Sequence, residues 1–206
     1  MQKLIKEINL VDEETKKLIK GRINEFELWG NKNSLVYYEL CFCLMTSNFN
    51  AERAIIIQNK LKKKFGVLSE KNLAIELKKS GHRFPNTRAD FLFEAQKHKN
   101  SIKKIVDSFE EDLSARNWLA ENIKGLGMKE ASHFLRNIGR KNVAIIDFHI
   151  IDLLEKHKLI ERPKTITKKK YLEIEKVLGK LGKKAGLNLA SLDLYLWFLE
   201  TGKVLK

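Results

Sequence analysis

IKGLGMKEASHFLRNIG, at residues 123–139, places two glycines between two stretches with a helical pattern of apolar residues. Gly125 and Gly127 lack a Cβ atom, so the backbone can adopt positive φ there and come close to a partner. The turn exposes N–H groups at the start of the second helix, where the helix dipole also favours an anion. The stretch predicts a helical hairpin that binds a DNA phosphate through its backbone.

Lys129 follows in the first turn of the second helix, which is the unfavourable end for a cation because it carries partial positive charge. Burial and the dipole both favour a neutral amine, the form in which lysine acts as a nucleophile. The alternative is an ordinary surface lysine beside Glu130. The Gly-x-Gly-x-Lys pattern alone favours this alternative. A nucleophilic role for Lys129 therefore needs support from a second segment of the sequence.

The second element is AIIDFHI at residues 144–150, where an apolar segment leads to Asp147 just before another helical pattern. Aspartate is a common helix N-cap, and a purely capping role is one interpretation. Eighteen positions separate Asp147 from Lys129, which leaves room for one helix and a return loop. The two side chains can therefore meet. The carboxylate would then lie close to the positive charge that forms on a substrate during attack by Lys129.

Together these residues resemble the helix-hairpin-helix DNA glycosylase superfamily. Its bifunctional members carry G-x-G-x-K-x-A and later V-D-x-H, matched here by GLGMKEA at 125–131 and IDFH at 146–149. The resemblance implies that Lys129 attacks C1′ of a damaged nucleotide and that Asp147 stabilises an oxocarbenium-like transition state. It also implies a Schiff base, followed by β-elimination on the 3′ side of the nucleotide.

The charge of the chain agrees with a polyanionic partner. Forty Lys and Arg residues against 26 Asp and Glu give a net charge of +14. Charge alone is not specific, because lysine-rich helices often present a solvated face. The lysine runs at 60–64 and 168–170 are expected to be exposed and to steer DNA in a salt-dependent way.

Only two prolines and apolar residues at three-and-four spacing predict an all-α protein, with no period-two pattern of useful length. The resemblance implies a two-lobed glycosylase fold. Residues 31–145 are expected to form a central helical lobe that ends in the hairpin. Residues 1–30 and 146–206 are expected to form a second, discontinuous lobe.

Neither a signal peptide nor a membrane span is expected, because the start is charged and the apolar run 35–45 is short and contains Glu39. An intracellular, cytoplasmic protein is predicted, on the nucleoid when it is bound to DNA. Cys41 and Cys43 are expected to be buried, reduced thiols. Relatives with an iron–sulfur cluster carry four C-terminal cysteines, which this chain lacks, and its histidines lack zinc spacing. We therefore expect no cofactor and no metal.

TSNFNAER, at residues 46–53, resembles the S-S-N-N-N-x-x-R segment with which 8-oxoguanine glycosylases enter the minor groove. The resemblance implies that Asn48 fills the gap left by the flipped base and that Arg53 faces the orphaned base. Phe49 replaces an asparagine, and its ring suits a wedge between bases. The alternative is that Asn48 or Asn50 only caps the next helix.

The short chain, which ends in WFLETGKVLK, resembles the compact archaeal-type second class of 8-oxoguanine glycosylases over nearly its whole length. The resemblance implies that the terminal carboxylate of Lys206 reaches the base pocket, where it can accept from N1–H and the N2 amino group. The Phe84 carbonyl, held extended before Pro85, is the candidate acceptor for the N7 hydrogen that only the damaged base carries. Phe84 or Trp197 would stack on the base, although a tryptophan on an amphipathic helix is equally well a core residue.

The sequence therefore predicts a monomeric, bifunctional 8-oxoguanine DNA glycosylase and AP lyase that acts on double-stranded DNA. Two alternatives stay open. One is a helix-hairpin-helix glycosylase for oxidised pyrimidines or alkylated purines, and the other is a DNA-binding hairpin module without enzymatic activity.

Overall fold

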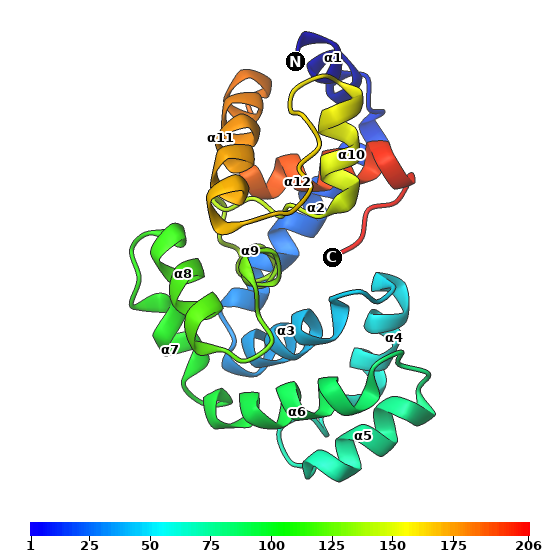
Figure 1. The fold of residues 1–206 in the computed structure, drawn as a ribbon, viewed down its shortest axis with the longest axis vertical. Coiled ribbons are helices and arrows are strands. Elements are labelled where there is room, and N and C mark those ends of the chain that lie inside the picture. Colours follow the sequence, from blue (N-terminus) through cyan, green and yellow to red (C-terminus); the bar gives the residue numbers. More distant parts are fainter.

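The computed structural model describes all residues from 1 to 206 as a helical protein without β-strands (Figure 1). The prediction of an all-α chain is confirmed. The helices are α1 (Gln2–Asn9), α2 (Glu13–Gly30), α3 (Asn33–Thr46), α4 (Ala51–Leu61), α5 (Glu70–Lys79), α6 (Pro85–Ala95), α7 (Ile102–Asp107), α8 (Asp112–Asn122), α9 (Met128–Asn137), α10 (Phe148–Lys156), α11 (Lys168–Ala185) and α12 (Leu189–Thr201), with a 3-10 turn at Gln96–His98.

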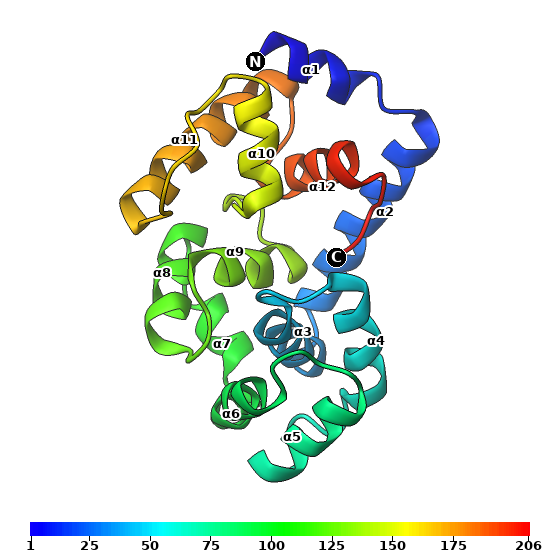
Figure 2. The ribbon, with the colours of Figure 1, turned by 45° about the vertical axis from the view of Figure 1, so that its right-hand side comes forward.

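Two separate hydrophobic clusters account for most of the core. The larger has 28 buried residues, beginning at Val36 in α3 and ending at Val143. The smaller has 14 and joins α1 to α10, α11 and α12, with Ala144 among its members. Figure 2 shows these two groups of helices one above the other, with the C-terminus between them. The change of cluster at residues 143–144 supports the predicted lobe boundary near 145, which itself stays a prediction.

Helix α2 connects the two groups and packs backbone to backbone against the end of α9. A Cβ atom on Gly30 would lie 2.1 Å from the Ile138 carbonyl oxygen. Gly139 has φ +89°, and a Cβ there would lie 2.8 Å from the Glu27 Cα. Side chains larger than hydrogen are therefore excluded on both sides of this contact, which fixes α9 relative to α2.

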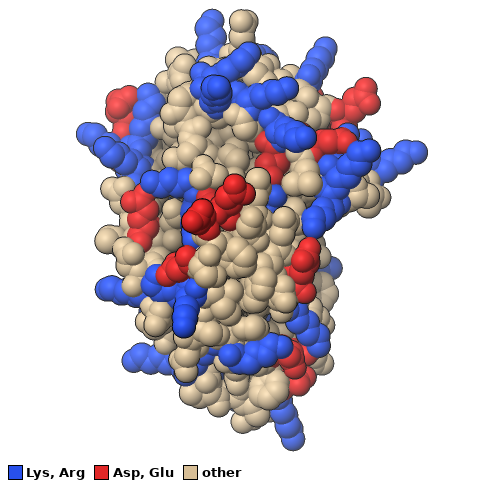
Figure 3. All heavy atoms as spheres, turned by 90° about the vertical axis from the view of Figure 1, so that its left-hand side faces the viewer, with Lys and Arg blue, Asp and Glu red and all other residues tan.

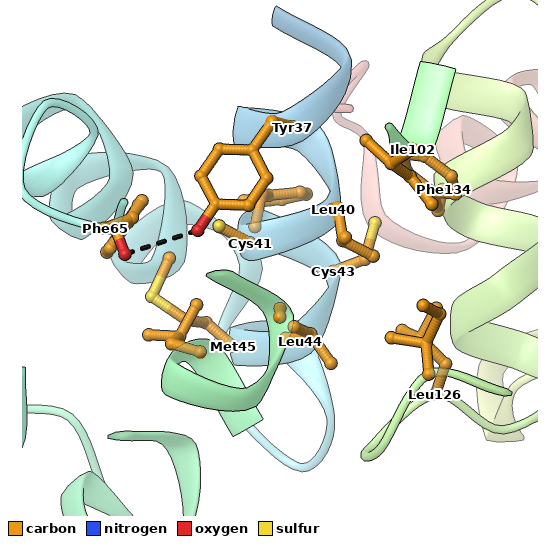
Figure 4. Close-up of a cluster of buried hydrophobic side chains, with 14 of the residues drawn as sticks. Tyr37, Leu40, Cys41, Cys43, Leu44, Met45, Phe65, Ile102, Leu126 and Phe134 are labelled. Atoms are coloured by element: carbon orange, nitrogen blue, oxygen red, sulfur yellow. Dashed lines mark hydrogen bonds between the residues drawn. The ribbon is translucent and has the colours of Figure 1, made fainter. Parts of the chain in front are cut away.

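From Val36 onward, helix α3 is buried on nearly every side and forms the centre of the larger cluster (Figure 4). The Tyr37 hydroxyl donates to the Phe65 carbonyl at 3.3 Å. Cys41 and Cys43 are free thiols with no exposed surface, as predicted. Burial raises the pKa of Cys41 to about 12 and the pKa of Cys43 well above its ordinary value, so both thiols stay protonated.

Basic side chains are dispersed rather than gathered in one patch on the face drawn in Figure 3. This face carries α7, α8 and α11, and Lys and Arg project across it with Asp and Glu between them. Lys168 and Lys169 are exposed and Lys170 is half-buried, in keeping with a largely solvated helix start. Separately, none of the helices combines the length and the apolar character that a bilayer span requires.

Candidate active site

The predicted hairpin lies between the end of α8 and the start of α9. Gly125 has φ +92°, and a Cβ atom there would lie 2.3 Å from the Phe91 Cδ2, so only glycine fits. Gly127 instead has extended backbone (φ −94°, ψ −173°) and is the N-cap residue of α9. Of the two glycines, only Gly125 has the positive φ expected from the sequence. No side chain caps α9, which leaves its first N–H groups free to bind an anion.

Lys129 and Asp147 line the same cavity, which has a volume of about 860 Å³. Lys129 lies in the first turn of α9 with a quarter of its side chain exposed, and its Nζ is 4.0 Å from Glu130 Oε1. Asp147 is the N-cap of α10, and its Oδ1 accepts the Ile150 N–H at 3.1 Å. The second carboxylate oxygen makes no hydrogen bond within the chain, so Asp147 can cap the helix and still face the cavity.

Aromatic side chains from α10 and α12 form one wall of the cavity. The ring of Trp197 meets the ring of His149 edge-on at 4.9 Å, and Phe148 packs against His149 at 4.1 Å while 62% exposed. The indole Nε1 of Trp197 is buried without a hydrogen-bond partner. Trp197 is half-buried and lines the cavity, so part of its ring can contact a bound molecule.

A buried ion pair that the sequence analysis missed lies behind the catalytic candidates. Arg136 of α9 lies 3.6 Å from Asp193 of α12, and both line the cavity. Burial, with a smaller effect of the Asp147 charge, raises the pKa of Asp193 to about 6, although Arg136 and Lys129 oppose this rise. The signal in the sequence was a single aspartate within the apolar run LASLDLYLW, where an unpaired charge would be costly.

Replacing Asp193 by Asn should change the pH dependence of stability. The raised pKa means that the contribution of Asp193 is complete below pH 4 and is lost as the pH rises through about 6. The free energy of unfolding of the wild type, relative to Asp193→Asn, should therefore fall by roughly 3 kcal/mol between pH 4 and pH 7. Urea unfolding at several pH values measures this difference. Parallel curves for the two proteins would contradict the assigned pKa.

The segment between α3 and α4 holds Asn48 in the left-handed region, at φ +54°, with its side chain exposed at the cavity. Asn50, not Asn48, caps α4 by accepting the Arg53 N–H at 3.0 Å. Phe49 stacks on His82 at 4.1 Å, and the Arg53 guanidinium lies 5.7 Å from its ring. Asn48 therefore has no capping role. Phe49 is half-buried, and one face of its ring is covered by His82.

Phe84 differs from the prediction in its backbone. The sequence predicts an extended residue with a free carbonyl, but ψ is 63° and the carbonyl accepts the Arg88 N–H at 3.1 Å. The reason is that Pro85 is the first residue of α6, which makes Phe84 its N-cap and gives its carbonyl a helical partner. The prediction of an extended residue is wrong, whereas a carbonyl oxygen can accept a second hydrogen bond, so the role of this carbonyl as an acceptor for the base stays a prediction. The Phe84 ring is 36% exposed and is not among the residues that line the cavity.

Lys206 lines the cavity, and its ammonium is buried against Glu39 and Gln58, two residues that the sequence analysis did not single out. Buried His133 of α9 also lines the cavity. Burial lowers the pKa of His133 well below its ordinary value, against the smaller opposing effect of the Lys206 main chain. Gly125, Gly127 and Arg53 lie outside the cavity lining, whereas Asn48, Phe49, Trp197 and Lys206 share it with Lys129 and Asp147.

This arrangement can combine anion binding by a helix start with attack by a lysine near a carboxylate. No three His, Cys, Asp or Glu side chains lie close enough together to hold a metal ion. The cavity brings together an amine and carboxylates, next to a hairpin at which a phosphate of the substrate can bind.

Comparison with known proteins identifies the family. A profile described as 8-oxoguanine DNA glycosylase matches residues 19–187. Two proteins named 8-oxoguanine DNA glycosylase/AP lyase are similar over most of their length. The one from Methanocaldococcus jannaschii is 49% identical over 206 residues (98% of this chain, 99% of its own), and the one from Korarchaeum cryptofilum is 48% identical over 192 residues (93% and 91%).

The crystal structure of the Methanocaldococcus jannaschii 8-oxoguanine glycosylase/lyase in complex with a 15mer DNA containing 8-oxoguanine has the same fold. Its TM-score is 0.95 at 49% identity, and the match covers 98% of this chain and 99% of the other. The chain belongs to the 8-oxoguanine DNA glycosylase family. The predicted superfamily and the helix-hairpin-helix glycosylase fold are confirmed.

Proposed function

We propose that this protein is a bifunctional 8-oxoguanine DNA glycosylase and AP lyase. The observation that carries the proposal is that Lys129 and Asp147 line one cavity beside the uncapped start of α9. The relatives named 8-oxoguanine DNA glycosylase/AP lyase, at up to 49% identity over nearly the full chain, support the same activity. They argue against a different lesion and against a hairpin module without enzymatic activity.

In the proposed reaction the free N–H groups at the start of α9, with Gly125 and Gly127, bind a phosphate of the damaged strand. The neutral amine of Lys129 attacks C1′, and the bond from C1′ to the base nitrogen breaks, so the bonding electrons leave with the base. Asp147 stabilises the positive charge that develops on the sugar. The attached nitrogen then loses a proton, and the C1′–O4′ bond breaks as the ring oxygen takes up a proton, which gives the Schiff base. The Schiff base acidifies the C2′ hydrogen, and removal of this proton expels the 3′ phosphate by β-elimination.

The base would be recognised by groups at the cavity edge. We propose that Trp197 stacks on the flipped base and that main-chain oxygens of Lys206 accept hydrogen bonds from its N1–H and N2 amino group. The exposed ring of Phe84 is proposed as a second stacking partner. On the other strand, Asn48 would fill the gap left by the base, Phe49 would wedge beside it and Arg53 would face the orphaned base.

A duplex with one 8-oxoguanine tests the proposed activity directly. The protein should release the base, nick the strand without added alkali and form a covalent adduct with the DNA when borohydride is present. The same duplex with guanine should give neither product. Release of oxidised pyrimidines or alkylated purines at a higher rate than 8-oxoguanine would refute the assigned substrate.

Deleting Lys206, or extending the chain by a few residues after it, should impair excision of 8-oxoguanine while cleavage of preformed abasic sites is mostly kept. The reason is that an abasic site offers no base to the Lys206 main chain, whereas Lys129 is unchanged. Single-turnover rates on the two substrates measure the difference. An equal loss on both would argue against a pocket role for Lys206.

The division into lobes, the position of the DNA, the cellular location and the oligomeric state are proposed as well. The change of hydrophobic cluster at residues 143–144 supports a division into a lobe of residues 31–145 and a lobe of residues 1–30 with 146–206. DNA would be held between the two lobes. Because DNA is the substrate, we place the enzyme in the cytoplasm, on the nucleoid, acting as a monomer.

A further inference from the structure

Three polar side chains from distant parts of the chain meet around one buried carboxylate, that of Glu39 in α3. Its Oε1 accepts from Lys206 Nζ at 2.7 Å and from Gln58 Nε2 at 3.0 Å. Its Oε2 accepts from Asn137 Nδ2 at 2.9 Å. Gln58 Oε1 is a second acceptor for the Lys206 ammonium, at 2.5 Å. Both carboxylate oxygens are thus satisfied, and we call these four residues the Glu39 network.

The ammonium of Lys206 is held on its other sides by aromatic rings. Its Nζ lies 4.4 Å from the centre of the Phe42 ring and 5.0 Å from that of Trp29. Only 9% of the Lys206 side chain and 6% of the Glu39 side chain are exposed. Lysine is rarely buried to this degree unless it is paired, because its charge loses hydration. The Lys206 ammonium has two hydrogen-bond acceptors, one of them charged, and two aromatic rings around it, so its burial is compensated.

The segment after α12 has few polar contacts, although Val204 packs against the hydrophobic cluster of Ile19, Phe26 and Leu194. Residues 203–206 form no regular structure, and the ion pair between Lys203 and Glu52 is solvent-exposed on both sides. Exposed pairs contribute little to stability, about 0 to 1 kcal/mol. The Glu39 network is therefore the strongest polar anchor of this segment. It also reaches α9, the helix of Lys129, through Asn137.

We propose that Glu39 is a specificity-positioning residue: by holding the Lys206 ammonium with Gln58, it fixes the Lys206 main chain at the cavity for recognition of the damaged base. This proposal rests on the proposed function, in which the Lys206 main chain contacts the base. Glu39 itself touches neither substrate nor reacting atoms, since it is buried and does not line the cavity. It acts on recognition of the base through Lys206.

Replacement of Glu39 by Gln tests the proposal because it keeps the shape of the side chain and removes its charge. The Lys206 ammonium then has no counter-charge, and it can return to water by moving the unstructured segment with it. Excision of 8-oxoguanine should fall about tenfold or more in single turnover, whereas cleavage of preformed abasic sites should stay within about twofold. The preference for 8-oxoguanine over guanine should fall in parallel.

Lys206→Met removes the other half of the pair and should give the same selective loss. Since both changes break one interaction, the double variant should be no worse than either single variant. Lys206→Arg, which keeps a cation, should restore most of the excision rate. Fully additive losses, or an equal loss on both substrates, would overturn the proposal.

A matched control separates positioning from general stability. Glu175 is also a buried carboxylate with a cationic partner, Arg116, but it lies in the other hydrophobic region. Glu175→Gln should lower the melting temperature without changing the ratio of the two rates. If it changes that ratio as Glu39→Gln does, the proposal is wrong. If the wild type acts on neither substrate, the proposed function itself fails, which is a different result.

Discussion

Lys129→Gln should abolish the covalent adduct that borohydride traps between the protein and 8-oxoguanine DNA. An amide nitrogen has no lone pair available for attack on C1′, so neither the Schiff base nor the β-elimination can form. Base excision should fall by roughly a thousandfold or more, because a nucleophile and its partners act as one unit. Gel electrophoresis of the trapped product and single-turnover excision rates measure both effects.

The same variant should still bind the damaged duplex, because the start of α9 and Gly125 are unchanged. Lys180→Gln is the matched control, since Lys180 is an exposed lysine of α11 outside the cavity. It should form the adduct at the wild-type rate. An adduct formed by Lys129→Gln as readily as by the wild type would show that another amine is the nucleophile.

Asp147→Asn should reduce base excision by about 10² to 10³-fold, the usual cost of removing one preorganised group that stabilises transition-state charge. Asparagine is as good an N-cap as aspartate, so Ile150 keeps its hydrogen-bond acceptor and the start of α10 is preserved. The melting temperature and DNA affinity should therefore be nearly unchanged. Thermal unfolding, a binding titration and a single-turnover assay provide the three measurements.

Asp152→Asn controls for the loss of a carboxylate from the same helix, since Asp152 pairs with Arg162 away from the cavity. Its excision rate should match that of the wild type. Normal excision by Asp147→Asn would reduce Asp147 to a helix cap.

Local patterns in the sequence predicted the helices and, together with the family resemblance, singled out Lys129 and Asp147, which line one cavity. Apolar spacing predicts amphipathic helices because it reports directly which face is buried. The hairpin turn at Gly125 follows from the chemistry of glycine, and the cap at Asp147 from that of aspartate. Each of these features depends only on residues that are neighbours in the sequence, and for this reason it can be predicted without the fold.

Contacts between distant residues were not predictable in this way. Arg136 pairs with Asp193, and Glu39 binds Lys206. The sequence around each of these residues does not indicate which distant residue it contacts. Phe84 shows a different limit: the preference of a residue before proline for extended backbone was overridden by its position as the N-cap of α6. Contacts between distant residues determined the ion pairs, and the start of the adjacent helix determined the conformation of Phe84.

The burial of Cys41 and Cys43 has a consequence for the survival of the enzyme during oxidative stress. Hydrogen peroxide reacts with thiolates, and a thiol that stays protonated and inaccessible forms sulfenic acid very slowly. Both cysteines meet these conditions, since they have no exposed surface and a raised pKa. The oxidants that convert guanine into its damaged form should therefore leave the thiols of the repair enzyme intact, so that activity persists while the lesions accumulate.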